Sequence, residues 1–218
     1  MDEYSRALDD YVNLIEKGEI ALGEFVASGE NFYLEYKREL FKWEPGSSTW
    51  STTGLMDAGE QRPYGREGFR IAVSDETVYV GKRDGRLFQS LDGGNRWNDV
   101  TTNLPVSFNL FNEIIFAGST IYVGTDNGVL TSDDGEKWVV LTDDNGDRIV
   151  MDCLAIASTE VYGVCDAGIY KLDNQGIWEL SWQEVPDRVR DLVVSNGRFY
   201  IATNRLGMFH IPLKKKDE

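Results

Sequence analysis

Cysteine and histidine are scarce in this chain of 218 residues, which has two cysteines and one histidine. Cys153 and Cys165 fall in adjacent predicted strands and do not have the spacing of metal ligands. We therefore expect two small buried hydrophobic side chains rather than a disulfide or a redox pair. His210 lies in the last predicted strand with no serine or cysteine motif beside it, which favours a structural role over a catalytic one.

Long apolar runs are absent, since none approaches the ~20 residues that a membrane-spanning helix needs. The chain begins Met1-Asp2-Glu3-Tyr4 and lacks the basic and apolar regions of a signal peptide. We expect no membrane insertion and a cytoplasmic location as the sequence is written. An extracytoplasmic location is expected instead if the sequence is a module cut from a longer exported protein.

Positive charge is also in short supply, with 22 basic against 37 acidic residues and a net charge of −15. This acidic, soluble composition argues against nucleic acid or an anionic membrane surface as the partner. Glycine motifs that cradle phosphate are missing. Residues 143–147 resemble the start of a calcium loop, but Leu154 stands where the bidentate glutamate belongs, so a polar turn is favoured. We expect neither a cofactor nor a metal.

What the chain does have is an internal repeat. Short apolar strands with period-two alternation recur, and the copies align on a tyrosine at positions 33, 79, 122, 162 and 200. Repeats of about 40–50 residues with four strands each, here termed A to D, are typical of β-propeller blades. The predicted fold is therefore all-β, a five-bladed β-propeller of four-stranded antiparallel blades.

The predicted domain organisation follows the repeat. Residues 20–212 form the propeller and 213–218 a charged tail. The blades lie near 20–55, 68–104, 111–142, 151–182 and 189–212.

The N-terminal residues 1–19 are open to two interpretations. Tyr4, Leu8, Tyr11, Val12 and Ile15 have the spacing of an amphipathic helix. Alignment with the repeats instead makes 11–15 the outer strand of a blade that closes the ring. The fifth blade ends after strand C, and its bare edge needs such a strand, the helix, or another chain to cover it. A homo-oligomer through this edge is one such arrangement.

Two turns resemble the Asp-box, or BNR repeat, of the β-propeller superfamily that includes sialidases, sortilin-type receptors and photosystem assembly factors. The residues that carry the resemblance are Ser90, Asp92, Gly94 and Trp97, and Thr131, Asp133, Gly135 and Trp138. In such a turn the aspartate accepts backbone N–H groups, glycine supplies a positive φ, and tryptophan packs at the blade edge. Both copies have Arg96 or Lys137 where the family has Ser or Thr. The resemblance implies a structural role for the box.

The predicted function is non-catalytic recognition of a protein or peptide by loops of the top face, where D-to-A connections and B-to-C turns meet. Two alternatives stay open: a lectin-like propeller that binds glycan, and a degenerate sialidase-like glycoside hydrolase. The second would need a cluster of three arginines and six blades, as the family resemblance implies. We assign no catalytic residue.

The binding candidates come from the start of strand A, the innermost strand. Positions 24, 70, 113, 153 and 191 are equivalent in the five repeats, and acidic residues are unusual in strands. A ring of these positions at the channel mouth would bind a cationic group or metal ion, unless neighbouring groups and water simply satisfy them. With two flanking residues, the predicted site is Glu24, Arg70, Glu113, Asp152, Arg190 and Asp191.

Overall fold

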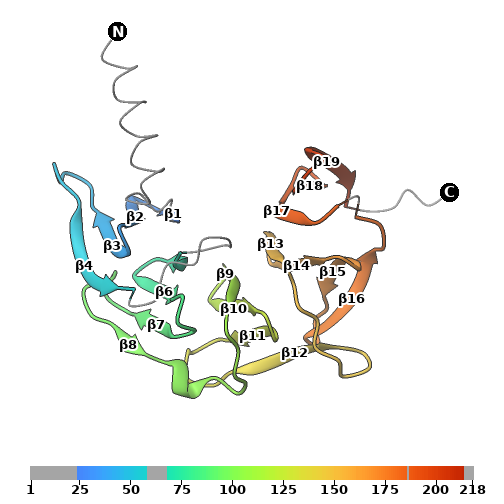
Figure 1. Ribbon diagram of the computed structural model, residues 1–218, viewed down its shortest axis with the longest axis horizontal. Coiled ribbons are helices and arrows are strands. Elements are labelled where there is room, and N and C mark those ends of the chain that lie inside the picture. Colours follow the sequence, from blue (N-terminus) through green and yellow to red (C-terminus); the bar gives the residue numbers. More distant parts are fainter. Residues whose placement is uncertain (1–23, 58–67, 186, 214–218) are drawn as a thin grey trace, which may run out of the picture. The chain divides into compact units, whose positions relative to one another are not determined.

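The computed structural model describes residues 24–57, 68–185 and 187–213, and every regular element among them is a β-strand apart from one short 3-10 turn (Figure 1). These residues form two compact units. The first comprises the described residues up to Asp84 together with Phe88–Asn98, and the second comprises Gly85–Leu87 and those from Asp99 onward. In this part of the chain no helix is long and apolar enough to cross a membrane. The N-terminal segment discussed above lies outside the described residues.

The first two repeats each form a four-stranded antiparallel sheet in sequence order. The first sheet is β1 (Phe25–Ser28), β2 (Asn31–Tyr36), β3 (Glu39–Trp43) and β4 (Ser51–Met56). The second is β5 (Arg70–Ser74), β6 (Thr77–Gly81), β7 (Leu87–Ser90) and the short β8 (Asn98–Asp99), followed by η1 (Thr101–Asn103). Consecutive strands pair because short polar turns separate the alternating apolar runs.

The remaining repeats belong to the second unit. The third has β9 (Phe111–Ala117), β10 (Thr120–Thr125), β11 (Gly128–Ser132) and β12 (Val139–Asp143). The fourth has β13 (Cys153–Ala157), β14 (Glu160–Cys165), β15 (Gly168–Leu172) and β16 (Ile177–Trp182). The last has β17 (Val189–Ser195), β18 (Arg198–Thr203) and β19 (Met208–Pro212), which form a three-stranded sheet among the described residues.

The A-to-B hairpin turns of the five repeats have the same length but differ at their second residue, where only Gly197 of the last repeat also has a positive φ. Two loop residues connect the paired strands, and the first has a positive φ: Gly29, Asp75, Gly118, Ser158 and Asn196. Two-residue hairpins require this left-handed conformation because it matches the twist of the flanking strands. The aligned tyrosines likewise face equivalent residues of strand A, from Val26 opposite Tyr33 to Val193 opposite Tyr200. The register that defines positions 24, 70, 113, 153 and 191 is therefore the register of the sheets.

Neighbouring sheets share hydrophobic cores within each unit, because alternate residues of each strand point to the same face. In the first unit Tyr33 and Leu40 pack with Val78 and Val80 of the next sheet and with Phe69, which immediately precedes it. In the second unit one core includes Val129, Leu154 and Trp178, and another includes Tyr162, Phe199 and Ile201. Cys153 is buried, Cys165 is half-buried, and both are free thiols.

One departure from separate four-stranded blades occurs in the second unit. The outer strands β12 and β16 pair in parallel, Thr142 with Ile177 and Asp143 with Trp178, so eight strands form one continuous sheet (Figure 1). The two outer edges thereby satisfy backbone groups that would otherwise be open. Repeat spacing could not predict this pairing, because it joins strands of different repeats.

Candidate functional site

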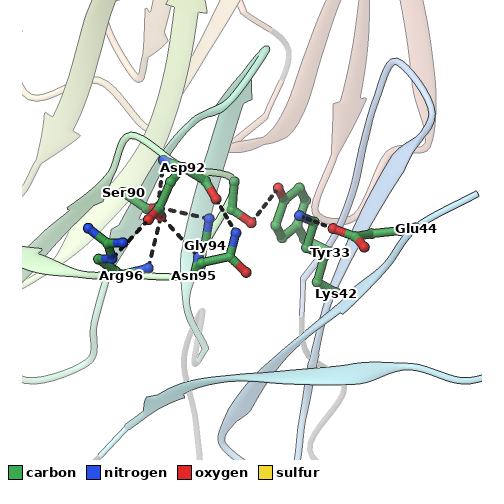
Figure 2. Close-up of polar contacts among 9 residues, drawn as sticks. Tyr33, Lys42, Glu44, Ser90, Asp92, Gly94, Asn95 and Arg96 are labelled. Atoms are coloured by element: carbon green, nitrogen blue, oxygen red, sulfur yellow. Dashed lines mark hydrogen bonds and ion pairs between the residues drawn. The ribbon is translucent and has the colours of Figure 1, made fainter.

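The turn at Ser90–Trp97 is held closed by its own side chains (Figure 2). The Gly94 N–H donates to Ser90 Oγ at 2.8 Å, and Ser90 Oγ donates to Asp92 Oδ1 at 2.9 Å. The same oxygen of Asp92 accepts the N–H groups of Asn95 and Arg96 at 3.1 and 2.8 Å. These bonds, led by that of Arg96, hold the pKa of Asp92 below its ordinary value. All of these carboxylate contacts lie inside the turn.

The second turn is closed in the same way, but one residue later than the sequence resemblance predicts. Ser132 Oγ accepts the Gly135 N–H at 2.8 Å, and Asp134 Oδ1 accepts those of Glu136 and Lys137, both at 2.8 Å. Thr131 and Asp133, the predicted residues, instead bond to strand β10.

The reason for this correction is the length of the turn. The second turn is one residue shorter, because six positions separate Ser132 from Trp138 whereas seven separate Ser90 from Trp97. Ser132 and Asp134 therefore take the places that Ser90 and Asp92 have in the first turn. Thr131 still belongs to the β10–β11 ladder and donates to the Ile121 carbonyl at 3.0 Å. Asp133 accepts a hydrogen bond from Thr120 Oγ1 at 2.5 Å.

The tryptophans that follow these turns have different surroundings. The indole N–H of Trp97 donates to the Thr53 carbonyl of strand β4 at 3.2 Å, which ties the turn to the preceding sheet. Tyr33 Oη donates to the Gly93 carbonyl at 3.2 Å and adds a second tie (Figure 2). Trp138 donates to Gly135 within its own turn at 3.0 Å. The hydrogen bonds described for these two turns go to groups within the turn or on neighbouring strands.

At the opposite end of the strands, the B-to-C turns and D-to-A connections bond to one another; we call this the loop end. In the second unit, Asp126 of the β10–β11 turn accepts the N–H of Asn109 at 2.9 Å and of Leu110 at 3.3 Å. Asn127 Nδ2 donates to the Ser107 carbonyl at 2.9 Å. In the last repeat, Arg205 forms a 3.0 Å ion pair with Asp187. The connecting segments are thus fixed by short-range polar contacts.

The loop end of the first unit contains a buried charge cluster that sequence analysis did not single out: Glu35, Asp57 and Arg83. Arg83 Nη2 lies 2.9 Å from Glu35 Oε1, and Arg83 Nε lies 3.3 Å from Asp57 Oδ2. The side chains of Glu35, Asp57 and Arg83 are 1%, 0% and 8% exposed. The sequence contains one sign of this cluster: strand alternation places Glu35 on the same inward face as Tyr33, which predicts a buried acidic residue.

The Glu35 carboxylate is also bonded to the backbone of the next strand A. The Phe69 N–H donates to Glu35 Oε2 at 2.7 Å. A Cβ at Gly68, whose φ is +146°, would lie 2.5 Å from this oxygen, so the close approach requires glycine. Burial raises the pKa of Glu35, outweighing the Phe69 N–H and the Arg83 guanidinium, which both lower it.

The predicted channel-mouth residues are divided between the two units. In the first unit, Glu24 Oε2 accepts the Ile71 N–H at 3.1 Å and lies 3.8 Å from Arg70 Nη1. In the second, Asp152 pairs with Arg188 at 3.4 Å, and Arg190 donates to Asn204 Oδ1 at 2.8 and 2.9 Å.

The two remaining channel-mouth candidates also lie in the second unit. Glu113 faces Gly124 on β10, and Asp191 faces Ala202 on β18. The predicted ring of positions 24, 70, 113, 153 and 191 draws on residues of both units, and it stays a prediction.

Other chemically notable groups have ordinary partners. His210 Nδ1 lies 2.8 Å from Arg198 Nη1 on the neighbouring strand. Asp143, at the start of the calcium-like segment, accepts the N–H groups of Asn145 and Asp147 at 3.0 and 2.8 Å, as a polar turn does. Among the residues described, no group of three or more His, Cys, Asp or Glu side chains could hold a metal ion.

A groove of about 550 Å³ lies at the hairpin end of the second unit, between residues 157–160 and 194–197, with Leu213 on its wall. Its lining combines hydroxyl, amide and apolar groups with the carboxylate of Glu160. It is at the other end of the strands from the loops described above.

Repeated antiparallel sheets that pack through shared cores, with their connections grouped at one end, define this fold as a β-propeller. Solved structures agree. The chain is similar to YCF48 bound to D1 peptide, at 16% identity and a TM-score of 0.58, over 86% of this chain and 63% of that one. It is also similar to a chain of the nidogen/laminin complex, at 15% identity and 0.63, over 89% and 75%.

A third similar structure is the GH74 xyloglucanase from Xanthomonas campestris, at 18% identity and a TM-score of 0.56, over 88% of this chain and 29% of that one. These likenesses show the fold. The chain spans under two thirds of the YCF48 chain and under a third of the xyloglucanase. No family model matches the sequence, and no curated protein matches it.

Proposed function

We propose that this chain is a non-catalytic propeller module, of five blades, that binds a protein or peptide segment through its loop end. The observation that supports the proposal is the polar network that fixes this end in the second unit. Asp126 holds the connection at Asn109 and Leu110, and Asp187 holds the turn at Arg205. Loops that are already ordered bind with a smaller entropic penalty than loops that must become ordered on binding.

Arg83 fixes the loop end of the first unit from within. Its side chain is 8% exposed and forms ion pairs with Glu35 and Asp57 at 2.9 and 3.3 Å. Two of the similar structures are complexes, of YCF48 with D1 peptide and of nidogen with laminin, which is compatible with the proposal.

The test is selection of binders from a random peptide display library, with a glycan array and a sialoside hydrolysis assay run on the same protein. We expect peptides to be enriched, no glycan to bind, and no hydrolysis. Arg148→Glu and Arg188→Glu, both at exposed residues of the loop end, should weaken binding of the selected peptide. Arg96→Glu is a matched control in the box turn, where the side chain is 91% exposed. Glycan binding without peptide binding, or equal loss in Arg96→Glu, would contradict the proposal.

A further inference from the structure

Three asparagines in the chain are followed directly by glycine: Asn127, Asn145 and Asn196. Asparagine is among the residues that heat and time damage chemically. In an Asn–Gly pair the glycine backbone nitrogen can attack the side-chain amide carbon, because no Cβ on the following residue obstructs its approach. The attack needs an amide side chain that is free to turn and a glycine N–H that is not held in a hydrogen bond. The three pairs differ in both respects.

The Asn127–Gly128 pair is held at its side-chain amide. Asn127 Nδ2 donates to the Ser107 carbonyl at 2.9 Å, and Asn127 Oδ1 accepts from Arg148 Nη1 at 3.2 Å. Gly128 is buried at the start of strand β11. Ring closure at this pair would have to break both side-chain bonds and open the strand.

The Asn145–Gly146 pair is held at both reacting groups. Asn145 Nδ2 donates to Asp144 Oδ1 at 3.1 Å and to Asp143 Oδ2 at 3.4 Å. The Gly146 N–H donates to the Asp143 carbonyl at 3.1 Å. The nitrogen that would attack is therefore engaged within the polar turn.

The Asn196–Gly197 pair, in the hairpin between β17 and β18, has neither restraint. Both residues are exposed. The Asn196 side chain and the Gly197 N–H have no hydrogen-bond partner among the residues that the structure describes. The Gly197 carbonyl accepts the Leu213 N–H at 2.9 Å, so the peptide group after Gly197 is fixed while the one before it is not.

The conformation of this hairpin turn allows the two groups to meet. Asn196 and Gly197 have φ values of 50° and 68°, the pattern of a type I′ turn. In the other four A-to-B hairpins only the first loop residue has a positive φ, which is the type II′ pattern. The two types differ by rotation of the peptide group between the loop residues. That rotation turns the Gly197 nitrogen toward the Asn196 side chain.

We propose that Asn196 is a site of spontaneous deamidation in the folded protein, and that its surroundings protect Asn127 and Asn145. The Gly197 nitrogen gives its proton to water and forms a bond to Asn196 Cγ. The bond from Cγ to the side-chain nitrogen breaks, and that nitrogen leaves as ammonia. Water then opens the succinimide ring at one of its two carbonyls and leaves aspartate or isoaspartate at this position. Water is the only co-reactant.

The modification would alter the groove at the hairpin end, where Asn196 and Gly197 form part of the wall with Glu160. It adds a second carboxylate to this lining. The isoaspartate product also adds one carbon to the main chain of a two-residue turn whose flanking residues Ser195 and Arg198 are paired. The inference is independent of the function of the loop end, which lies at the other end of the strands.

Peptide mapping of the full chain after days in warm, mildly alkaline buffer tests the proposal. Trypsin separates the three pairs into peptides 97–137, 138–148 and 191–198, and mass spectrometry measures the conversion in each. We expect Asn196 to convert several-fold faster than Asn127 and Asn145. In urea, where the surroundings of all three pairs are lost, their rates should become similar. Equal rates in the folded protein, or no conversion of Asn196, would overturn the proposal.

An independent measurement uses the ammonia released by the folded protein. In Asn196→Gln the side chain is one carbon longer and closes a ring with the next nitrogen much more slowly, so ammonia release should fall several-fold below that of the wild type. The matched Asn145→Gln control, in the protected polar turn, should release ammonia as the wild type does. Unchanged release from Asn196→Gln would place the reaction elsewhere and overturn the assignment.

Discussion

At the scale of single residues, the same carboxylate chemistry has opposite consequences inside a turn and inside a core. Asp92 accepts two backbone N–H groups and a serine hydroxyl at an exposed turn, and these bonds favour its charged form. Glu35 is buried with Arg83 and Asp57, and loss of water favours its neutral form. The two acids should therefore contribute to stability in opposite directions as pH changes.

Asp92 should stabilise the protein above its ordinary pKa and lose that contribution in acid. Its pKa in the folded protein lies below the ordinary value of 3.8, so stability is lost as pH falls from about 3.8 through the lowered pKa. In Asp92→Asn, whose side chain does not titrate, the melting temperature should fall less steeply as pH is lowered. Thermal melts from pH 2 to 6 measure this difference. An equal fall in melting temperature for the two proteins would show that Asp92 is not the source of the acid dependence.

Glu35 should show the reverse dependence. Its pKa in the folded protein is above the ordinary value of 4.5, so the folded state binds more protons than the unfolded state between pH 4.5 and the raised pKa. The stability of the wild type relative to Glu35→Gln should therefore fall as pH rises above about 4.5. Denaturant titrations of both proteins at several pH values provide the comparison. A rising difference would mean that ion pairing with Arg83 outweighs burial.

At the scale of elements, Trp138 and Trp178 are both buried at the outer strands, but they differ in whether the indole N–H has a hydrogen-bond acceptor. Trp178 is 2% exposed and Trp138 is 8% exposed. Trp178→Ala should cost about 3–5 kcal/mol, as for a buried aromatic residue. Trp138→Phe should cost about 1 kcal/mol more than Trp178→Phe, because Trp138 donates to Gly135 whereas the Trp178 indole N–H has no acceptor among the described residues.

Urea unfolding of the two phenylalanine variants measures this difference directly. Equal costs would show that the Trp138 bond adds nothing beyond the packing of the ring. A Trp178→Ala protein with unchanged stability would contradict the packing assignment itself.

Tyr33 ties the first sheet to the turn of the second. Tyr33→Phe should cost about 1 kcal/mol by leaving the Gly93 carbonyl without its donor. Burial, with Glu76 and Glu44, raises the pKa of Tyr33 from 10.0 to about 12. The unfolded chain therefore ionises first, and the advantage of wild type over Tyr33→Phe should shrink as pH rises from 10 to 12. Unfolding at pH 7, 10 and 11 checks this, and a constant gap would contradict the link.

Sequence periodicity located the strands because period-two alternation and two-residue turns are local properties. The aligned tyrosines gave the register of strands A and B in every repeat. Contacts between distant segments were not accessible in this way. The parallel pairing of β12 with β16 and the Glu35–Arg83 contact join residues from different repeats. The shift from Asp133 to Asp134 arose because motif spacing was matched at the tryptophan, although the turn is one residue shorter.

At the scale of the whole molecule, the two ends of the strands have different roles in this account. The hairpin end repeats a two-residue turn with a positive φ at its first residue, whereas the loop end varies in sequence and is fixed by side-chain bonds such as Asp126 to Asn109. Rigid scaffolds that position variable connections are typical of binding proteins. On this account the A-to-B hairpin turns and the turns at 90–97 and 132–138 stabilise the blades, and the loop-end connections determine what is bound.

The most direct test of this account is an amide hydrogen-exchange footprint of the full chain with and without a selected peptide. We predict that the peptide slows exchange in the connections near 104–110, 143–150 and 183–190 and in the turns near 126–128 and 204–207. The box turns at 90–97 and 132–138 should exchange at the same rate in both samples. Protection confined to the A-to-B hairpins or the box turns would contradict the assignment of the loop end as the recognition surface.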